Sequence, residues 1–236
     1  MYIAIVVAAL GAGIIQTVTG FGAAVFMMLI MPRFFDMVAA PAITSAISVG
    51  LSATLAWKFR KYIQWRQCLI PTIIYLAFSI TSIGLARKVN LEDLTFAFGV
   101  FLVVLAICFY CLFDRITLRA NWKTAALTAA FSGITSGFFG IGGPLMAMYF
   151  ISTTEQKECY IGTLQFLFAF TNIVNLFARV ANGMFTVELI PFVILGIAGI
   201  TVGKKVGLRI LDRIDPGRIK KLVYAFVGIS GILTLI

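Results

Sequence analysis

Residues 133–144 read GITSGFFGIGGP, and this stretch decides the fold. It lies inside an apolar run, residues 125–151, that carries no charged side chain. Five glycines and a proline within this stretch disfavour one continuous helix, so we predict a break at residues 140–143. Pro144 suits the first turn of a new helix after the break. Free backbone N–H groups at a helix start favour an anion, which makes the break a candidate binding site.

The composition indicates a membrane protein. Of the 236 residues, 61% are hydrophobic and 12% are charged, which is unlike a soluble domain. Several apolar runs reach the roughly 20 residues that a helix needs to cross a bilayer. The first run begins at Met1 without a basic leader, so we interpret it as a retained segment and not as a signal peptide. We therefore predict an all-α polytopic membrane protein.

Eight apolar segments can be marked, with polar loops between them. Their approximate bounds are 2–31, 39–57, 68–86, 94–113, 124–151, 159–178, 189–203 and 222–236. An offset of 120 residues aligns the first four segments with the last four. Under this offset the matched pairs include Gly13 with Gly133, Gly20 with Gly140, Gly22 with Gly142, and Pro71 with Pro191.

The alignment predicts two repeats, residues 1–118 and 119–236, each with one glycine-interrupted segment at the matching position. Such paired interruptions are the best sequence pointer to the binding site of a transporter. The alternative is that these glycines only allow helices to pack closely.

The distribution of lysine and arginine predicts how the segments lie in the membrane. If all eight segments cross once, the two sides carry eleven and eight basic residues. If the first and fifth segments turn back at their glycine breaks, the split becomes fifteen to four, as the positive-inside rule expects. We therefore predict two inverted-topology repeats, each a re-entrant helical hairpin plus three transmembrane helices. Both termini then lie on the outer side of the cell membrane.

The glycine-rich segment from Ser132 to Pro144, its weaker copy around Gly20-Phe21-Gly22 and the two four-segment halves resemble the sulfite exporter TauE/SafE family. The first copy departs from the second, since Ala23 and Ala24 stand where Gly143 and Pro144 would. The resemblance implies an anion transporter of the cytoplasmic membrane, for sulfite or for sulfonates such as sulfoacetate.

The two breaks supply the first set of candidate substrate-binding residues. Backbone N–H groups from two opposing helix starts could hold one anion without a buried lysine or arginine. The candidates are Gly20, Phe21, Gly22, Gly140, Ile141, Gly142 and Gly143.

Polar side chains on two other segments complete the candidate site. The sixth segment carries Gln165, Asn172, Asn175 and Arg179 on one helical face, and the second carries Ser45, Ser48 and Ser52. These side chains either contact the substrate or form hydrogen bonds between helices. For Arg179, near the outer end of its segment, we expect either attraction of anions or a snorkelling anchor.

The remaining residue types limit the chemistry. The chain has no histidine, and all nine carboxylates lie in loops or at segment ends, so a buried proton relay is not expected. We predict no catalytic residue, no metal site and no cofactor, and we interpret the four cysteines as small buried residues. An intramembrane enzyme is thereby disfavoured.

The sequence thus predicts a secondary transporter of small organosulfur or sulfur oxyanions, with an anion channel or uniport pore as the alternative. The expected partners are the anionic substrate and membrane lipids, whose head groups would meet the basic stretch at residues 204–221. Nucleic acid is not expected as a partner, and a homodimer stays open.

Overall fold

A computed structural model of the chain describes residues 1–112 and 121–213, and all regular structure in these ranges is helical. The α-helices are α1 (Tyr2–Thr19), α2 (Ala23–Ile30), α3 (Ala39–Lys58), α4 (Trp65–Ala86), α5 (Leu91–Leu112), α6 (Trp122–Phe139), α7 (Gly143–Thr153), α8 (Lys157–Ala181) and α9 (Ile190–Leu211). Short 3-10 turns are η1 (Met31–Arg33), η2 (Arg60–Tyr62) and η3 (Val187–Leu189). Within the described ranges, five helical stretches are long and apolar enough to cross a membrane: α1, α3, α4, α8 and the stretch Val187–Leu211.

The predicted segments match these helices closely at most boundaries. The largest difference is in α9, which continues to Leu211, whereas the sequence predicted an end at residue 203. Lys204 and Lys205, taken as loop residues, lie within the helix, because lysine and arginine favour helix and let it continue through this basic stretch. The predicted eighth segment, 222–236, lies outside the described residues.

Both long segments are broken at their glycines. α1 ends at Gly20 with φ of 85°, and α2 begins after Gly22 with φ of 100°. α6 ends at Gly140 with φ of 72°, and Pro144 lies in the first turn of α7. Positive φ is costly for any residue with a Cβ atom, so these three glycines are required by the backbone itself.

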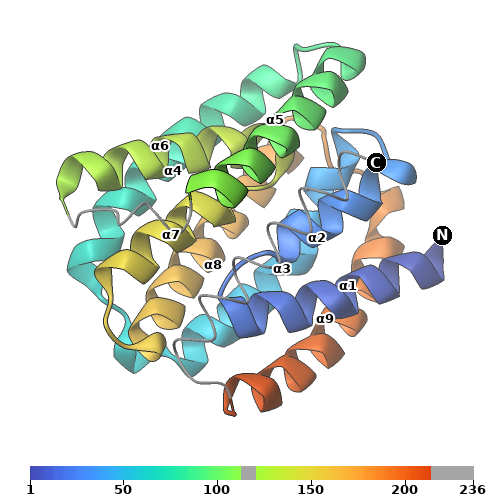
Figure 1. Cartoon of the computed structure of the whole chain (residues 1–236). Coiled ribbons are helices and arrows are strands. Elements are labelled where there is room, and N and C mark those ends of the chain that lie inside the picture. The colour runs from blue at the N-terminus through green and yellow to red at the C-terminus, as the bar shows by residue number, and fades with distance from the viewer. Residues whose placement is uncertain (113–120, 214–236) are drawn as a thin grey trace.

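Other glycines allow two helices to pack closely. This was the alternative explanation of the glycine pattern, and it applies to glycines outside the breaks. A Cβ atom at Gly199 or Gly203 would meet the backbone of α1, and one at Gly133 would meet the backbone of α4. Such small residues let two helix backbones approach closely in a membrane. As a result α1 lies along α9 and α6 lies along α4 (Figure 1).

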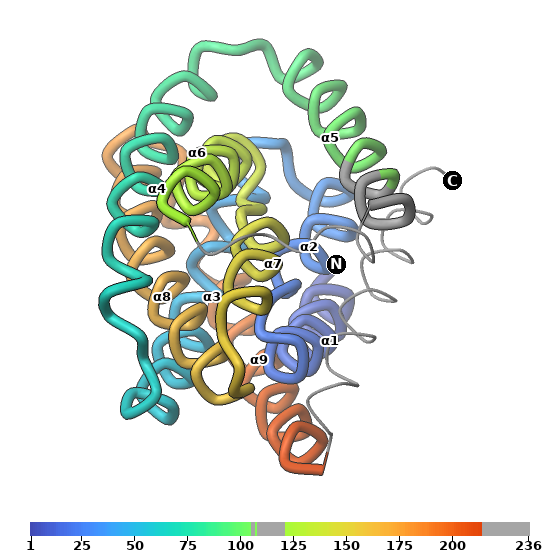
Figure 2. Tube along the Cα trace, turned by 60° about the vertical axis from the view of Figure 1, so that its left-hand side comes forward, coloured from blue at the N-terminus to red at the C-terminus, as the bar shows by residue number. Residues whose placement is uncertain are grey.

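The helix pairs repeat under the same 120-residue offset as the sequence. α9 is the counterpart of α4, so the pair α1 and α9 corresponds to the pair α6 and α4. α3 packs against its own counterpart α8, and these two helices lie between the outer pairs (Figure 2). Each half therefore packs its broken segment against a long helix of the other half.

The two broken segments start from opposite ends of the bundle. α1 runs parallel to α9, because Val6 lies beside Gly199 and Thr17 beside Gly207. α6 runs parallel to α4, because Gly133 lies beside Tyr75 and Gly137 beside Ser79. α9 runs parallel to α3, since Gly196 contacts Ile47 and Lys204 bonds Thr54.

α8 completes this geometry, because it runs parallel to α4 and antiparallel to α3. The first relation follows from the bonds that link Thr163 to Cys68 and Asn175 to Ser79, and the second from the contact of Gly162 with Phe59. α4 and α9 therefore point in opposite directions, and so do α6 and α1.

The described basic residues are unevenly divided between these ends. One end, which we call the basic end, is where α3 and α9 finish and where α4, α6 and α8 begin. It carries Lys58, Arg60, Lys61, Arg66, Lys123, Lys157, Lys204, Lys205, Arg209 and Arg213. The opposite end carries Arg33, Arg87, Lys88 and Arg179.

Candidate functional site

A small cavity lies where the two breaks come together. Its volume is about 30 Å³, which is room for one or two water molecules. Six residues predicted from the sequence line it: Gly22, Gly140, Gly142, Gly143, Ser48 and Asn172. Five further lining residues were not predicted: Gln16, Ala24, Val25, Tyr75 and Phe168.

Two helix starts face this cavity. Gly22 and the next residues open α2, and Gly142 and Gly143 open α7. The N–H groups in the first turn of a helix have no partner within that helix. They also carry the positive end of the helix dipole. The cavity is thus bordered by two partially positive helix ends that come from different halves of the chain.

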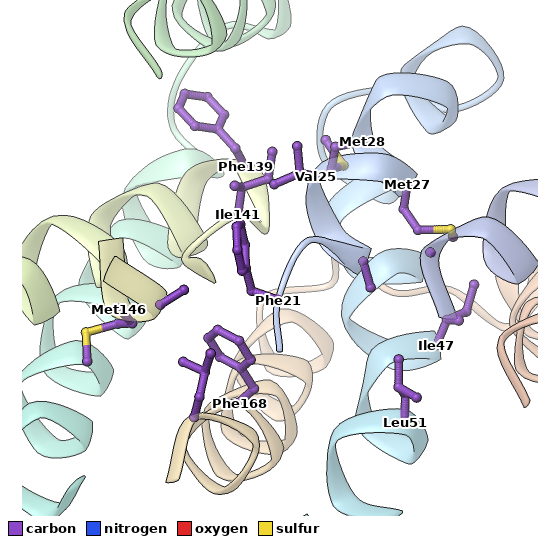
Figure 3. Packing of buried hydrophobic residues seen from close by; sticks show 14 of the residues in the cluster. Phe21, Val25, Met27, Met28, Ile47, Leu51, Phe139, Ile141, Met146 and Phe168 are labelled. Atoms are coloured by element: carbon purple, nitrogen blue, oxygen red, sulfur yellow. The ribbon is translucent and has the colours of Figure 1, made fainter. Parts of the chain in front are cut away.

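The middle residues of the two breaks belong to the buried hydrophobic core and do not line this cavity. Phe21 and Ile141, which correspond under the 120-residue offset, are fully buried (Figure 3). A methyl group at Gly143 would lie 3.3 Å from Phe21 Cβ and 3.5 Å from Phe168 Cζ. The structure therefore gives Phe21 and Ile141 a packing position between the breaks, although the sequence placed them with the binding residues.

The carbonyl end of α1 is held by donors on α8. Gln165 Nε2 donates to the Gly20 carbonyl at 2.7 Å, and the Tyr160 hydroxyl donates to the Thr19 carbonyl at 2.7 Å. Gln16 Nε2 in turn donates to Gln165 Oε1 and to Ser52 Oγ, both at 3.0 Å. The predicted residues Gly20, Gln165 and Ser52 thus lie behind the cavity, and Gln16 connects them to it.

The carbonyl end of α6 is held by the other half of α8. Arg179 Nη2 donates to the Ser136 carbonyl at 3.0 Å and to the Gly137 carbonyl at 2.8 Å. The Arg179 side chain is 1% exposed, so the snorkelling interpretation is wrong. The guanidinium finds two carbonyl acceptors and a favourable helix dipole at the end of α6, while its buried Nε has no hydrogen-bond partner among the described residues.

Asn175 joins α8 to both α6 and α4. Its Nδ2 donates to Ser136 Oγ at 3.2 Å, and its Oδ1 accepts from Ser79 Oγ at 2.8 Å. This is the interhelical hydrogen bonding that the sequence offered as the alternative to substrate contact.

The predicted serines on α3 also differ in whether they line the cavity. Ser45 Oγ donates to the Pro41 carbonyl of its own helix at 2.8 Å, and Ser45 does not line the cavity. Ser48 lines the cavity, is 3% exposed, and its Oγ has no hydrogen-bond partner within the described ranges. A buried hydroxyl without a partner is unfavourable unless something else in the site accepts or donates to it.

Of the lining residues that were not predicted, Gln16 could have been found from the sequence, whereas Tyr75 could not. Gln16 is a polar side chain inside a long apolar segment, which is itself a sign of a functional position. Tyr75 carries no such sign, because its place depends on the packing of α4 against α6. There its hydroxyl lies directly over Gly142, where a Cβ atom would collide with it.

Comparison with known proteins identifies the family of this chain. The family model described as sulfite exporter TauE/SafE matches residues 5–234. The chain belongs to the TauE/SafE family. It is also 25% identical to a probable membrane transporter protein of Methanocaldococcus jannaschii, over 95% of this chain and 91% of that protein. No solved structure matches the chain.

Membership in the TauE/SafE family, together with the long apolar helices, makes this chain a multi-pass membrane transporter. The family is one of exporters, which accords with a role in transport and not in catalysis.

Proposed function

We propose that this TauE/SafE chain is a secondary transporter of small organosulfur or sulfur oxyanions, such as sulfite, sulfoacetate or another sulfonate. The anion is held between the two helix breaks. The observation that carries the proposal is that both breaks, which lie 120 residues apart in the chain, border one cavity.

The lining suits a compact oxyanion. Backbone N–H groups at the starts of α2 and α7 are natural donors to an anion. The Ser48 and Tyr75 hydroxyls and the Asn172 amide can donate as well. Among the described residues, the lining includes no carboxylate that would repel the ligand.

The proposed membrane arrangement follows from the helix directions. We propose that α1 with α2, and α6 with α7, are re-entrant hairpins, which the opposite directions of α1 and α6 and the glycine break after each of them support. Residues 1–118 and 119–236 then form two inverted repeats, each a hairpin plus three transmembrane helices. The positive-inside rule assigns the basic end to the cytoplasm, next to anionic lipid head groups, and both termini to the outer side of the cell membrane.

The size of the cavity requires a conformational step. A volume of about 30 Å³ holds a water molecule or two, so a sulfur oxyanion needs the breaks to separate. Side chains of α8 form hydrogen bonds to the helix ends at both breaks. Phe21 of the first break also packs beside Gly143 of the second, next to Phe168 of α8. We propose that rocking of the α1 and α9 pair against the α4 and α6 pair opens the cavity to each side in turn, as in other inverted-repeat transporters.

A ligand panel with purified full-length protein tests the proposal. A ligand that binds only the folded form raises the apparent melting temperature by mass action. We expect sulfite or a sulfonate to raise the Tm in a panel of sulfite, thiosulfate, sulfoacetate, taurine and sulfate. If no member raises it, and none is taken up by proteoliposomes, the proposed substrate class is wrong. Saturable uptake supports a transporter, whereas ohmic conductance supports the alternative of an anion channel.

A further inference from the structure

We infer that the fixed charges around the cavity sum to about +1, so that the site selects singly charged oxyanions over doubly charged ones, and that Arg179 supplies the charge that makes this sum positive. This inference rests on the proposed function and narrows its substrate class. Hydrogen sulfite and sulfonates with no second acidic group fit it. Sulfate, the sulfite dianion and sulfoacetate, which carries a carboxylate beside its sulfonate, do not, so the inference removes sulfoacetate from the proposed substrates.

The helix ends at the breaks cancel one another. The starts of α2 and α7 contribute about +0.5 each, and the ends of α1 and α6 contribute about −0.5 each. All four ends lie at the breaks that border the cavity. Two opposing helix starts alone therefore do not make the site positive, because each break brings a carbonyl end with its amide end.

Arg179 changes this balance. Its guanidinium lies on the last turn of α6, bonded to the Ser136 and Gly137 carbonyls, and Gly140 of the cavity lining follows within one turn. Tyr75, another lining residue, packs on the same helix, with its backbone carbonyl beside Gly133 of α6. Among the described residues no carboxylate forms a salt bridge with Arg179, so its full positive charge is added to the sum.

The carbonyl end of α1 receives neutral donors only. Gln165 and Tyr160 satisfy the Gly20 and Thr19 carbonyls without adding charge. The described cavity lining itself has no lysine, arginine or carboxylate. The total is therefore that of Arg179 alone, about one positive charge, which a monoanion neutralises and a dianion exceeds.

A second observation indicates that a ligand completes this site. The Ser48 hydroxyl lines the cavity, is 3% exposed and has no hydrogen-bond partner among the described residues. An oxyanion oxygen would accept from it. An uncompensated second negative charge, in contrast, would be desolvated between protein and lipid, where electrostatic energies are large.

Methanesulfonate and sulfate make the sharpest comparison. Both have a tetrahedral sulfur, but methanesulfonate has a methyl group where sulfate has a fourth oxygen with a second negative charge. We expect methanesulfonate to bind the purified full-length protein at least about tenfold more tightly, which corresponds to about 1.4 kcal/mol. The apparent affinity for total sulfite should fall about tenfold per pH unit once the dianion predominates, while that for methanesulfonate stays level. Tyr75 is the one titratable side chain in the described cavity lining, so the protein itself adds little to this pH dependence.

Variants of Arg179 test the origin of the charge. Arg179→Gln keeps an amide donor for the carbonyls but loses the charge, so we expect methanesulfonate binding to weaken at least about tenfold. Arg179→Lys keeps the charge and should retain binding within about threefold. Arg33→Gln removes an exposed basic residue far from the breaks and serves as the matched control, with unchanged binding expected.

The outcomes separate the two proposals. If sulfate binds as tightly as methanesulfonate, or if Arg179→Gln binds as the parent does, the charge inference is overturned while oxyanion transport stands. If neither methanesulfonate, sulfite nor sulfate binds or is transported, the proposed function is overturned with it. Should Arg179→Gln fail to fold, the comparison of the two ligands on the parent protein still decides the charge inference.

Discussion

Replacing Gly142 by alanine tests the contact that closes the cavity on the side of α4. Gly142 has φ of −120°, which alanine adopts freely, so the effect of the change is steric. The added Cβ atom would collide with the Tyr75 hydroxyl and would lie 2.6 Å from the Ser132 carbonyl oxygen. Overpacking of this kind costs roughly 1–3 kcal/mol, and for a chain of this size that lowers the Tm by roughly 2–12 °C.

The same substitution should remove the ligand response. Because the Tyr75 hydroxyl and the start of α7 both border the cavity, moving either one disturbs the donors that an anion would meet. We expect Gly142→Ala to lose the Tm increase with sulfite or methanesulfonate even at temperatures where the variant is folded. Both properties can be read from one thermal-unfolding titration in detergent.

Gly84→Ala is the matched control. Gly84 lies in α4, and an added Cβ atom there would have no neighbour within 4 Å. Removing a flexible glycine from an open helix position stabilises a protein by roughly 0.4–1 kcal/mol. A double change, Gly142→Ala with Tyr75→Phe, removes one of the two clashing groups and should recover part of the lost stability. Equal Tm values and equal ligand responses for Gly142→Ala and Gly84→Ala would refute this account of the site.

Three further predictions follow from the same contacts. Gln165→Leu leaves the buried Gly20 carbonyl without its side-chain donor and should lower the free energy of unfolding by about 1–3 kcal/mol, measured by denaturation. Gly203→Leu drives a side chain into the backbone of α1 and should prevent recovery of monodisperse protein, checked by size-exclusion chromatography. Single cysteines at Arg60 and Arg87, in a background with the native cysteines replaced, should react with an impermeant reagent from opposite sides of the membrane. Labelling of both from one side would contradict the proposed topology.

The helix breaks could be predicted from the sequence because their cause is local. Gly20, Gly22 and Gly140 adopt left-handed backbone, and clusters of glycine are the direct sign of it. The opposite directions of α1 and α6 could be anticipated from the number of basic residues at each end, because that number depends on topology and not on packing.

The partners of the polar side chains could not be predicted in this way. Spacing placed Gln165, Asn175 and Arg179 on one face of α8 correctly, but it could not say what faces them. The carbonyls that Arg179 caps and the position of Tyr75 over Gly142 exist only once α6 lies along α4. The parallel register of these two helices depends on glycine contacts between distant segments, which the sequence of either helix alone does not contain.

A polar helix face is costly in a membrane, and the hydrogen bonds that α8 makes explain why it nevertheless carries one. The half of α8 near the basic end holds the carbonyl end of α1 through Tyr160 and Gln165. The other half holds the carbonyl end of α6 through Arg179. Each broken helix leaves carbonyls that lipid cannot satisfy, so the polar stripe supplies their donors. Asn172, the stripe residue between the two holding sets, lines the cavity. One helix therefore fixes both breaks relative to each other, and any motion that opens the cavity must either carry α8 with one break or loosen one of its two sets of hydrogen bonds.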